Sequence, residues 1–180
     1  MVWAAAALLA FFSCLLSACS PETSTEIPPA PPNTLRIISS LPRKGPHAAQ
    51  AQLISQGIDL AIKQRQGEFQ GLTIEHVALD GGSDESGEWS TERERGNALA
   101  AAGDPLVVAY IGPYNSGAAK ISLPTTNKAG LLHGSPTTTW PGLTEPGWED
   151  GEPGIYYPTG ERNFVRLMPS DEEEAVAAAR

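Results

Sequence analysis

Hydroxyl side chains follow two predicted strands near the middle of the chain. Ser116 lies directly after the loop that follows the apolar run 106–111, and it opens the next predicted helix. The loop after the following strand, 131–134, carries three threonines in a row. Because parallel strands end at a common edge of a sheet, we expect these hydroxyls to gather there as donors and acceptors for a ligand. The candidate residues are Ser116, Thr137, Thr138 and Thr139.

The start of the predicted helix at Ser116 adds a second kind of donor. The first backbone N–H groups of a helix have no partner within it, and the helix dipole is positive at that end, so this loop suits a carboxylate or a phosphate. Gly112 and Gly117 have the spacing of a P-loop, but Ala118 and Ala119 stand where Lys and then Ser or Thr are required. A nucleotide triphosphate site is therefore excluded. Helix capping by Ser116 and ligand binding by Ser116 remain open alternatives, and the two can coexist.

No other pattern indicates catalysis, a metal ion or a nucleic acid. The histidines show no ligand spacing, the segment 80–84 lacks the glycine and glutamate of a calcium loop, and no Ser-His-Asp or paired-carboxylate arrangement can be named. Both cysteines lie in the first 19 residues, which leaves the later domain without a disulfide or a Cys-based metal site. The net charge of −9, with no basic stripe, disfavours nucleic acid. We expect neither an enzyme nor a cofactor.

Strands and helices alternate from residue 34 onward. Alternation at short spacing predicts right-handed crossovers and an α/β fold, a doubly wound, mostly parallel sheet flanked by helices. The continuously apolar run 106–111 predicts a strand that is buried on both faces. The remaining predicted strands are 35–39, 72–79, 131–134 and 163–167, and the predicted helices are 48–66, 92–102, 116–129 and one that begins after Ser170.

The first 33 residues have a different character. Residues 2–18 are apolar or small, and Leu16-Ser17-Ala18-Cys19 resembles the lipobox of bacterial lipoproteins, which favours a signal peptide over 1–19 and lipid attachment at Cys19. A transmembrane anchor is the alternative, and the lack of a Lys or Arg before the run departs from the positively charged start of a signal peptide. The proline-rich segment 20–33 predicts an extended tether. We therefore expect an extracytoplasmic, lipid-anchored domain.

The last residues predict continuation of the chain. Arg180 lies within a helical run that has no glycine, asparagine or proline to end it. We expect residues 34–170 to form one ligand-binding lobe and 171–180 to begin the crossover helix to a second lobe that is missing from this sequence.

Several short segments, in order, carry a resemblance to a known family. From Thr34 onward the chain resembles the first lobe of the type I periplasmic binding proteins, specifically the substrate-binding proteins for branched-chain amino acids and amides in ABC transporters. The resemblance covers most of the chain after the tether. It is carried by the segments 109–117, 130–132, 135–139 with Leu143-Thr144, and 164–166 before Ser170-Asp171.

The resemblance implies roles for individual residues. Ser116 and Thr139 would hold the carboxylate or ammonium group of an amino acid, and Thr137 would offer its backbone carbonyl to the ammonium. Tyr114 and Gln50 would line the side-chain pocket, although the loop 42–47 departs from the Gly- and Ser-rich sequence usual in the family. The longer, aromatic stretch 140–160 would be a surface elaboration.

The expected function is therefore capture of a small amino acid or amide for an ATP-driven uptake system, with a membrane permease as partner. The alternative is a ligand-sensing input domain of a receptor or signalling complex, without transport. A few charge-assisted hydrogen bonds at about 1.5 to 3 kcal/mol each must offset an association cost of at least about 4 kcal/mol. One lobe alone is thus expected to bind at about millimolar affinity at best.

Overall fold

The computed structural model describes residues 25–180, and the lipid-attachment prediction at Cys19 lies outside this range. Six strands form one sheet in the order β2-β3-β1-β4-β5-β6. All neighbouring pairs are parallel except β2 with β3, which confirms the predicted mostly parallel α/β fold. The strands are β1 (Thr34–Leu41), β2 (Glu68–Phe69), β3 (Leu72–Asp80), β4 (Val107–Ile111), β5 (Leu132–Ser135) and β6 (Phe164–Arg166).

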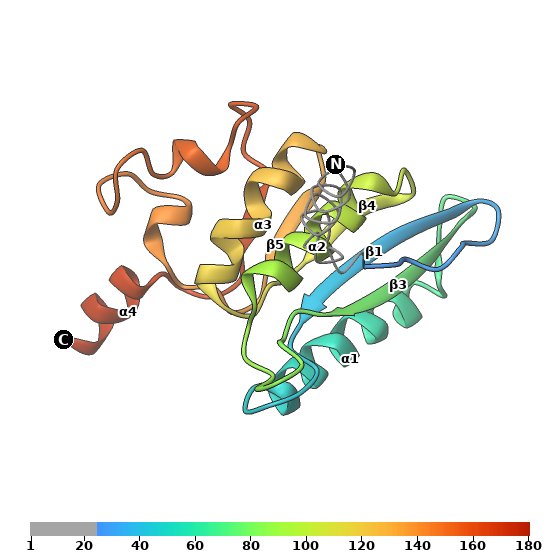
Figure 1. Ribbon diagram of the computed structural model, residues 1–180, viewed down its shortest axis with the longest axis horizontal. Coiled ribbons are helices and arrows are strands. Elements are labelled where there is room, and N and C mark those ends of the chain that lie inside the picture. The colour runs from blue at the N-terminus through green and yellow to red at the C-terminus, as the bar shows by residue number, and fades with distance from the viewer. Residues whose placement is uncertain (1–24) are drawn as a thin grey trace, which may run out of the picture.

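Helices cover both faces of this sheet. Ser39 and Ser40 are adjacent in β1 and so point to opposite faces. The side chain of Ser39 bonds to His76, which reaches α1, whereas the side chain of Ser40 bonds to Glu94 on α2. α2 and α3 lie side by side on that second face (Figure 1). The helices are α1 (Ala48–Gln64), α2 (Thr91–Gly103), α3 (Ser116–Lys128) and α4 (Asp171–Ala178), with short 3₁₀ turns at η1 (Pro141–Leu143) and η2 (Gly154–Tyr156).

Two apolar clusters hold the α2/α3 face together. One lies between the central strands and α2, where Ile38 and Tyr110 are fully buried. The other lies around α3 and includes Leu123 and residues of the stretch 140–160, such as Leu143 and Tyr156. The stretch predicted as a surface elaboration is therefore packed onto the lobe, and it contains both 3₁₀ turns.

The prediction that 106–111 is buried on both faces is wrong at one position. Val108 remains 44% exposed, and Leu132 in β5 and Val165 in β6 are 51% and 49% exposed. α1 packs mainly against β1 and β3. No helix within residues 25–180 is both long and apolar enough to cross a membrane.

α4 leaves the lobe at the end of β6. Ser170 caps it: its side chain accepts the Glu173 amide, while the Glu173 carboxylate accepts the Ser170 amide. This reciprocal pair is a capping box, and it fixes where the helix begins. Figure 1 shows α4 projecting away from the sheet, with the C-terminus beyond it.

Candidate ligand-binding site at the strand ends

The loops that follow β4 and β5 are tied together at the carboxyl edge of the sheet. Ser116 Oγ accepts hydrogen bonds from the backbone nitrogens of Thr139 and Trp140, at 3.2 Å each. Thr137 Oγ1 donates to the carbonyl of Tyr114 at 2.7 Å, and Ser135 Oγ donates to the carbonyl of Pro113 at 3.1 Å. The structure thus brings Ser116, Thr137 and Thr139 into one neighbourhood.

The other predicted site residues divide into two groups. Tyr114 and Gln50 meet, since the tyrosine hydroxyl donates to the Gln50 amide oxygen, and the His47 ring stacks on Tyr114 with centroids 4.8 Å apart. Thr138, in contrast, is 0% exposed, and its Oγ1 has no hydrogen-bond partner. Its side chain is not presented to solvent, whereas Ser116, Thr137 and Thr139 are each half-buried.

The start of α3 faces the same neighbourhood. The N-cap residue, Asn115, makes no side-chain hydrogen bond to the helix, so no side chain caps the amides of the first turn. The earliest helical bond in this turn runs from the Ala119 amide to the Asn115 carbonyl. The uncapped amides and the positive end of the helix dipole favour an anion beside Ser116.

A buried histidine supports the loop after β4, although the sequence indicated no role for it. His133 Nε2 lies 2.8 Å from the carbonyl oxygen of Gly112, and Nδ1 lies 2.8 Å from Thr126 Oγ1 in α3. Burial lowers the pKa of His133 to about 4, so the ring is neutral near neutral pH. Gly112 itself has φ +123°, and a Cβ there would lie 2.4 Å from the Ser40 carbonyl oxygen. Only glycine fits this backbone position.

A buried carboxylate supports the end of β1 beneath the site. Glu94 accepts hydrogen bonds from Ser40 at 2.6 Å and from Tyr110 at 2.8 Å, and Asn97 donates to the same serine oxygen at 2.9 Å. Burial raises the pKa of Glu94 to about 7, and the hydrogen bonds oppose this rise. This cluster fixes the β1 backbone against which Gly112 packs.

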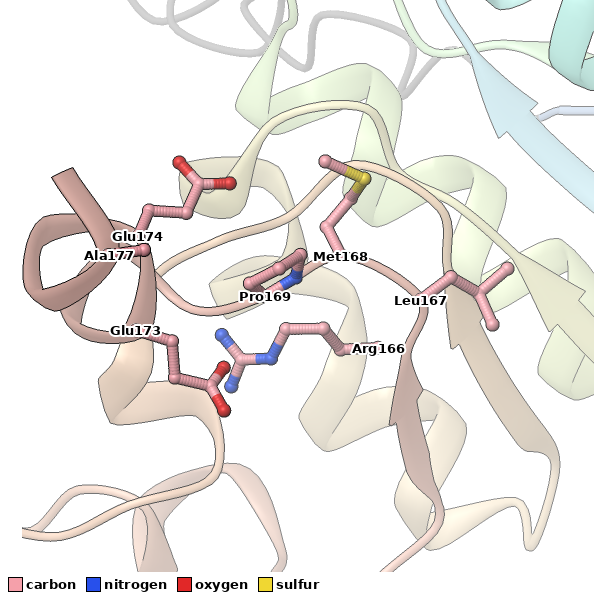
Figure 2. Close-up of a pocket in the computed structure, with 7 residues that line it drawn as sticks. All are labelled: Arg166, Leu167, Met168, Pro169, Glu173, Glu174 and Ala177. Carbon is pink, nitrogen blue, oxygen red and sulfur yellow. The ribbon is translucent and has the colours of Figure 1, made fainter.

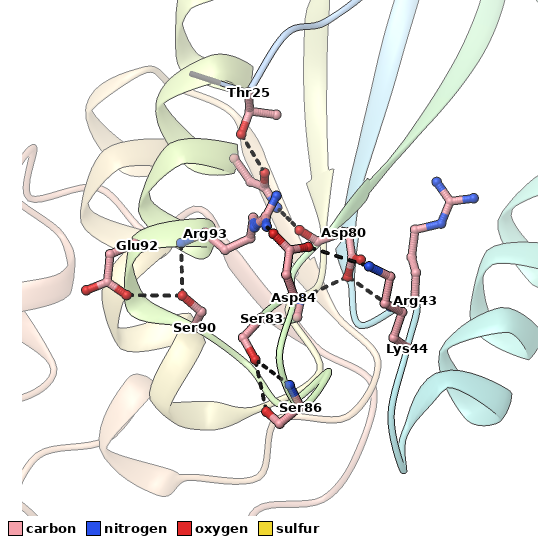
Figure 3. A network of polar contacts seen from close by, with 12 residues as sticks. Thr25, Arg43, Lys44, Asp80, Ser83, Asp84, Ser86, Ser90, Glu92 and Arg93 are labelled. Carbon is pink, nitrogen blue, oxygen red and sulfur yellow. Dashed lines mark hydrogen bonds and ion pairs between the residues drawn. The ribbon is translucent and has the colours of Figure 1, made fainter. Parts of the chain in front are cut away.

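Two further loops border the site. Asp80 ends β3 and accepts the amides of Arg43, at 3.0 Å, and Gly82, at 2.9 Å, while Asp84 pairs with Arg93 at 2.6 Å and Lys44 at 3.5 Å (Figure 3). These contacts join the loop after β1 to the loop after β3. They give the acidic segment 80–84 a structural role as a turn.

An aromatic residue, Trp89, borders the start of α3, and no sequence motif pointed to it. A Cβ on Gly117 would lie 2.8 Å from the Trp89 ring, so this ring packs directly on the first turn of the helix. Trp89 is 36% exposed. It provides apolar surface next to the polar groups around Ser116.

Among the described residues, Ser39, His76 and Asp59 form a hydrogen-bonded chain that sequence spacing did not reveal. His76 Nε2 lies 2.8 Å from Ser39 Oγ, and Nδ1 lies 2.6 Å from Asp59 Oδ1 on α1. The serine is only 1% exposed while the aspartate is exposed, the reverse of what a nucleophile requires. The chain of contacts therefore ties α1 to the sheet. Within residues 25–180, no three His, Cys, Asp or Glu side chains are grouped as metal ligands.

Two hollows in the surface lie away from Ser116. One of about 590 Å³ opens between the end of β6 and α4, with Arg166 and Glu173 facing each other across it (Figure 2). Another of about 420 Å³ lies between the first turns of α1 and the sheet, beside Leu41 and Ala51. Neither is lined by Ser116 or Thr139. The polar groups around Ser116 thus lie outside both of these hollows.

Comparison with known proteins gives structural relatives only. No protein-family model matches the sequence, and the search of curated proteins gave no match. A substrate-binding protein of an ABC transporter from Desulfitobacterium hafniense, in complex with Leu, has 27% sequence identity and a TM-score of 0.62. The similarity covers 81% of this chain and 37% of that one.

Two more distant structures share the fold. The branched-chain amino acid transporter substrate-binding protein LivJ from Streptococcus pneumoniae, in complex with isoleucine, is 24% identical with a TM-score of 0.59. It matches over 77% of this chain and 34% of its own. A solute-binding protein from Rhodopseudomonas palustris, in complex with 3,4-dihydroxybenzoic acid, is 18% identical with a TM-score of 0.60, covering 77% and 32%.

These neighbours are solute-binding proteins, not enzymes. This chain spans between 32% and 37% of the length of each, which fits a single lobe. The chain thus has the fold of one lobe of the type I periplasmic binding proteins, and its structural neighbours are the substrate-binding proteins of branched-chain amino acid ABC transporters.

Proposed function

We propose that residues 34–170 are the first lobe of an extracytoplasmic substrate-binding protein that captures a small amino acid or amide for an ABC transporter. In this proposal residues 1–19 are a signal peptide with lipid attachment at Cys19, and 20–33 form the tether. Residues 171–180 begin the crossover to a second lobe. The partner is a membrane permease, to which the loaded protein delivers its ligand.

The hydrogen-bonding state of Ser116 carries this proposal. Its oxygen already accepts two backbone amides, from Thr139 and Trp140, so both of its acceptor positions are used. The O–H group is then left as a donor. Among the described residues, Thr139 Oγ1 makes no hydrogen bond, and the first amides of α3 are uncapped. A set composed mainly of donors suits an acceptor group with negative charge.

A carboxylate is the ligand group that this arrangement favours. Leucine, isoleucine and 3,4-dihydroxybenzoic acid, the ligands named for the three relatives, share a carboxyl group. The apolar surface of Trp89 and the ring of Tyr114 lie near the polar groups around Ser116, and they suit the apolar side chain of a ligand. We therefore assign the carboxylate end of an amino acid to this lobe.

Ligands that keep or lose the carboxylate test the proposal. In NMR titrations of residues 20–180, L-leucine and isovalerate should shift the amides of Ser116, Gly117 and Thr139 with dissociation constants of about 1 mM or weaker. Leucinamide, which lacks the carboxylate, should shift them at least about tenfold more weakly, because it presents no charged acceptor. Equal responses to isovalerate and leucinamide would remove the basis for the carboxylate assignment.

A further inference from the structure

The peptide from Thr139 to Trp140 is held from two opposite sides. Ser116 Oγ accepts hydrogen bonds from the backbone amides of both Thr139 and Trp140, as described above. Arg166, at the end of β6, donates from Nη1 to the carbonyl of Thr139 at 3.0 Å and to the carbonyl of Trp140 at 2.9 Å. One serine oxygen and one guanidinium nitrogen thus take up all four backbone groups of these two residues.

Two additional contacts hold the segment Thr139–Trp140 and the residues that follow it in place. Arg166 Nη2 donates to Thr144 Oγ1, beyond the η1 turn, so the guanidinium spans the loop from Thr139 to Thr144. The Thr139 carbonyl also accepts the amide of Asp171, the first residue of α4, at 2.9 Å. The same carbonyl therefore connects the candidate site with the segment by which the chain leaves the lobe.

Packing and Arg166 both hold this loop: Leu143 is fully buried in the cluster around α3 and Trp140 packs against it, whereas Arg166 binds the backbone of the loop. Arg166 is half-buried and borders the hollow of about 590 Å³ in front of α4, where Leu167 is 77% exposed (Figure 2). A planar fork of N–H donors can bridge two carbonyls and a hydroxyl at once, which a lysine ammonium cannot do with the same geometry.

We propose that Arg166 is a positioning residue for the carboxylate site: it fixes the Thr139–Trp140 peptide against Ser116 Oγ and so orients the hydroxyls of Ser116 and Thr139. This inference rests on the proposed function and adds a residue that touches no ligand. Loss of the guanidinium leaves the Thr139 carbonyl with the Asp171 amide, at 2.9 Å, and the Trp140 carbonyl with the Leu143 amide, at 3.4 Å. The amides of Thr139 and Trp140 then spend more time away from Ser116.

Amide hydrogen exchange measures the positioning directly, without a ligand. In residues 20–180 carrying Arg166→Gln, the amides of Thr139 and Trp140 should exchange at least about tenfold faster, because about two charge-assisted bonds that restrain them are lost. Arg166→Lys should lie between this variant and wild type. The buried amide of Ile38 in β1 should keep its wild-type rate.

A matched control is Arg162→Gln. Arg162 also donates to this loop, at the Thr144 carbonyl, and packs on the Tyr157 ring, but it does not contact Thr139 or Trp140. Its loss should leave the exchange of those two amides unchanged. An L-leucine titration completes the comparison, with the dissociation constant raised about tenfold by Arg166→Gln and unchanged by Arg162→Gln.

The outcomes separate the two proposals. Unchanged exchange at Thr139 and Trp140 in Arg166→Gln overturns the positioning role, and an equal acceleration at Ile38 also overturns it, because the residue then supports the whole fold. Unchanged leucine affinity in that variant overturns its relevance to the site. Absence of carboxylate binding by the wild-type chain, with the exchange results as expected, refutes the proposed function. The positioning of Thr139 and Trp140 by Arg166 is then still established.

Discussion

Ser116 Oγ lies 3.2 Å from the backbone nitrogen of Thr139, and this contact joins the loop after β4 to the loop after β5. The two residues are 23 positions apart in the sequence. Because the serine is used as an acceptor inside the protein, it faces the outside as a donor. In the proposed site, one hydroxyl group thus serves both structural support and ligand recognition.

Gly112 is predicted to be the most sensitive glycine of the site. Gly112→Ala should lower the free energy of unfolding by at least about 2 kcal/mol, since φ is +123° and the added Cβ would lie 2.4 Å from the Ser40 carbonyl oxygen. Urea unfolding followed by circular dichroism measures this. Gly130→Ala is the control: φ is +70° but no atom lies within 4 Å of the Cβ position, so we expect a loss of about 1 kcal/mol. Equal losses would contradict the close-approach argument.

The pH dependence of stability should reveal two buried groups that oppose each other. The raised pKa of Glu94, about 7, gives a contribution that is complete below pH 4.5 and is lost as pH rises to 7. The lowered pKa of His133, about 4, gives a contribution that is complete above pH 6.5 and is lost as pH falls to 4. Between pH 4.5 and 6.5 the two slopes have opposite signs and similar size.

The variant Glu94→Gln separates the contribution of His133 to the pH dependence from that of Glu94. The variant keeps only the His133 effect, so its stability should fall by about 2 kcal/mol relative to wild type when the pH is lowered from 6.5 to 4.5. Urea unfolding midpoints of wild type and variant, measured at three pH values between 4.5 and 6.5, test this expectation. Parallel stability curves for wild type and variant would show that Glu94 does not have a raised pKa.

The Ser39-His76-Asp59 chain is predicted to stabilise the fold and to have no nucleophilic activity. Ser39→Ala leaves Nε2 of His76, a side chain only 6% exposed, without a partner and should cost about 1 to 3 kcal/mol. Wild-type protein should not react with a fluorophosphonate, because Ser39 is 1% exposed. Covalent labelling at Ser39, located by mass spectrometry, would contradict the structural role.

The alternating elements could be predicted from the sequence because their signals are local. The run 72–79 became β3 over Leu72–Asp80, and the helix expected at 116–129 became α3 over Ser116–Lys128. The parallel order of strands followed from the alternation itself. The exposure of Val108 could not be predicted, since an apolar run does not say whether a covering helix is present on each face.

The site could be predicted only in part, for a physical reason. Loops after parallel strands meet at one edge, so the proximity of Ser116 and Thr139 followed from topology. The burial of Thr138 and the contacts of Arg166 and His133 depend on side-chain directions and on pairs far apart in the chain. No spacing rule encodes such contacts.

Removal of the Ser116 hydroxyl tests the central claim most directly. L-leucine is titrated into residues 20–180 of the wild type, Ser116→Ala and Ser116→Thr, with the amides of Gly117 and Thr139 followed by NMR. The account predicts saturable shifts in the wild type at about millimolar leucine, at least about tenfold weaker binding in Ser116→Ala, and recovery in Ser116→Thr. Equal leucine binding by wild type and Ser116→Ala, or shifts confined to the other end of the sheet, would contradict it.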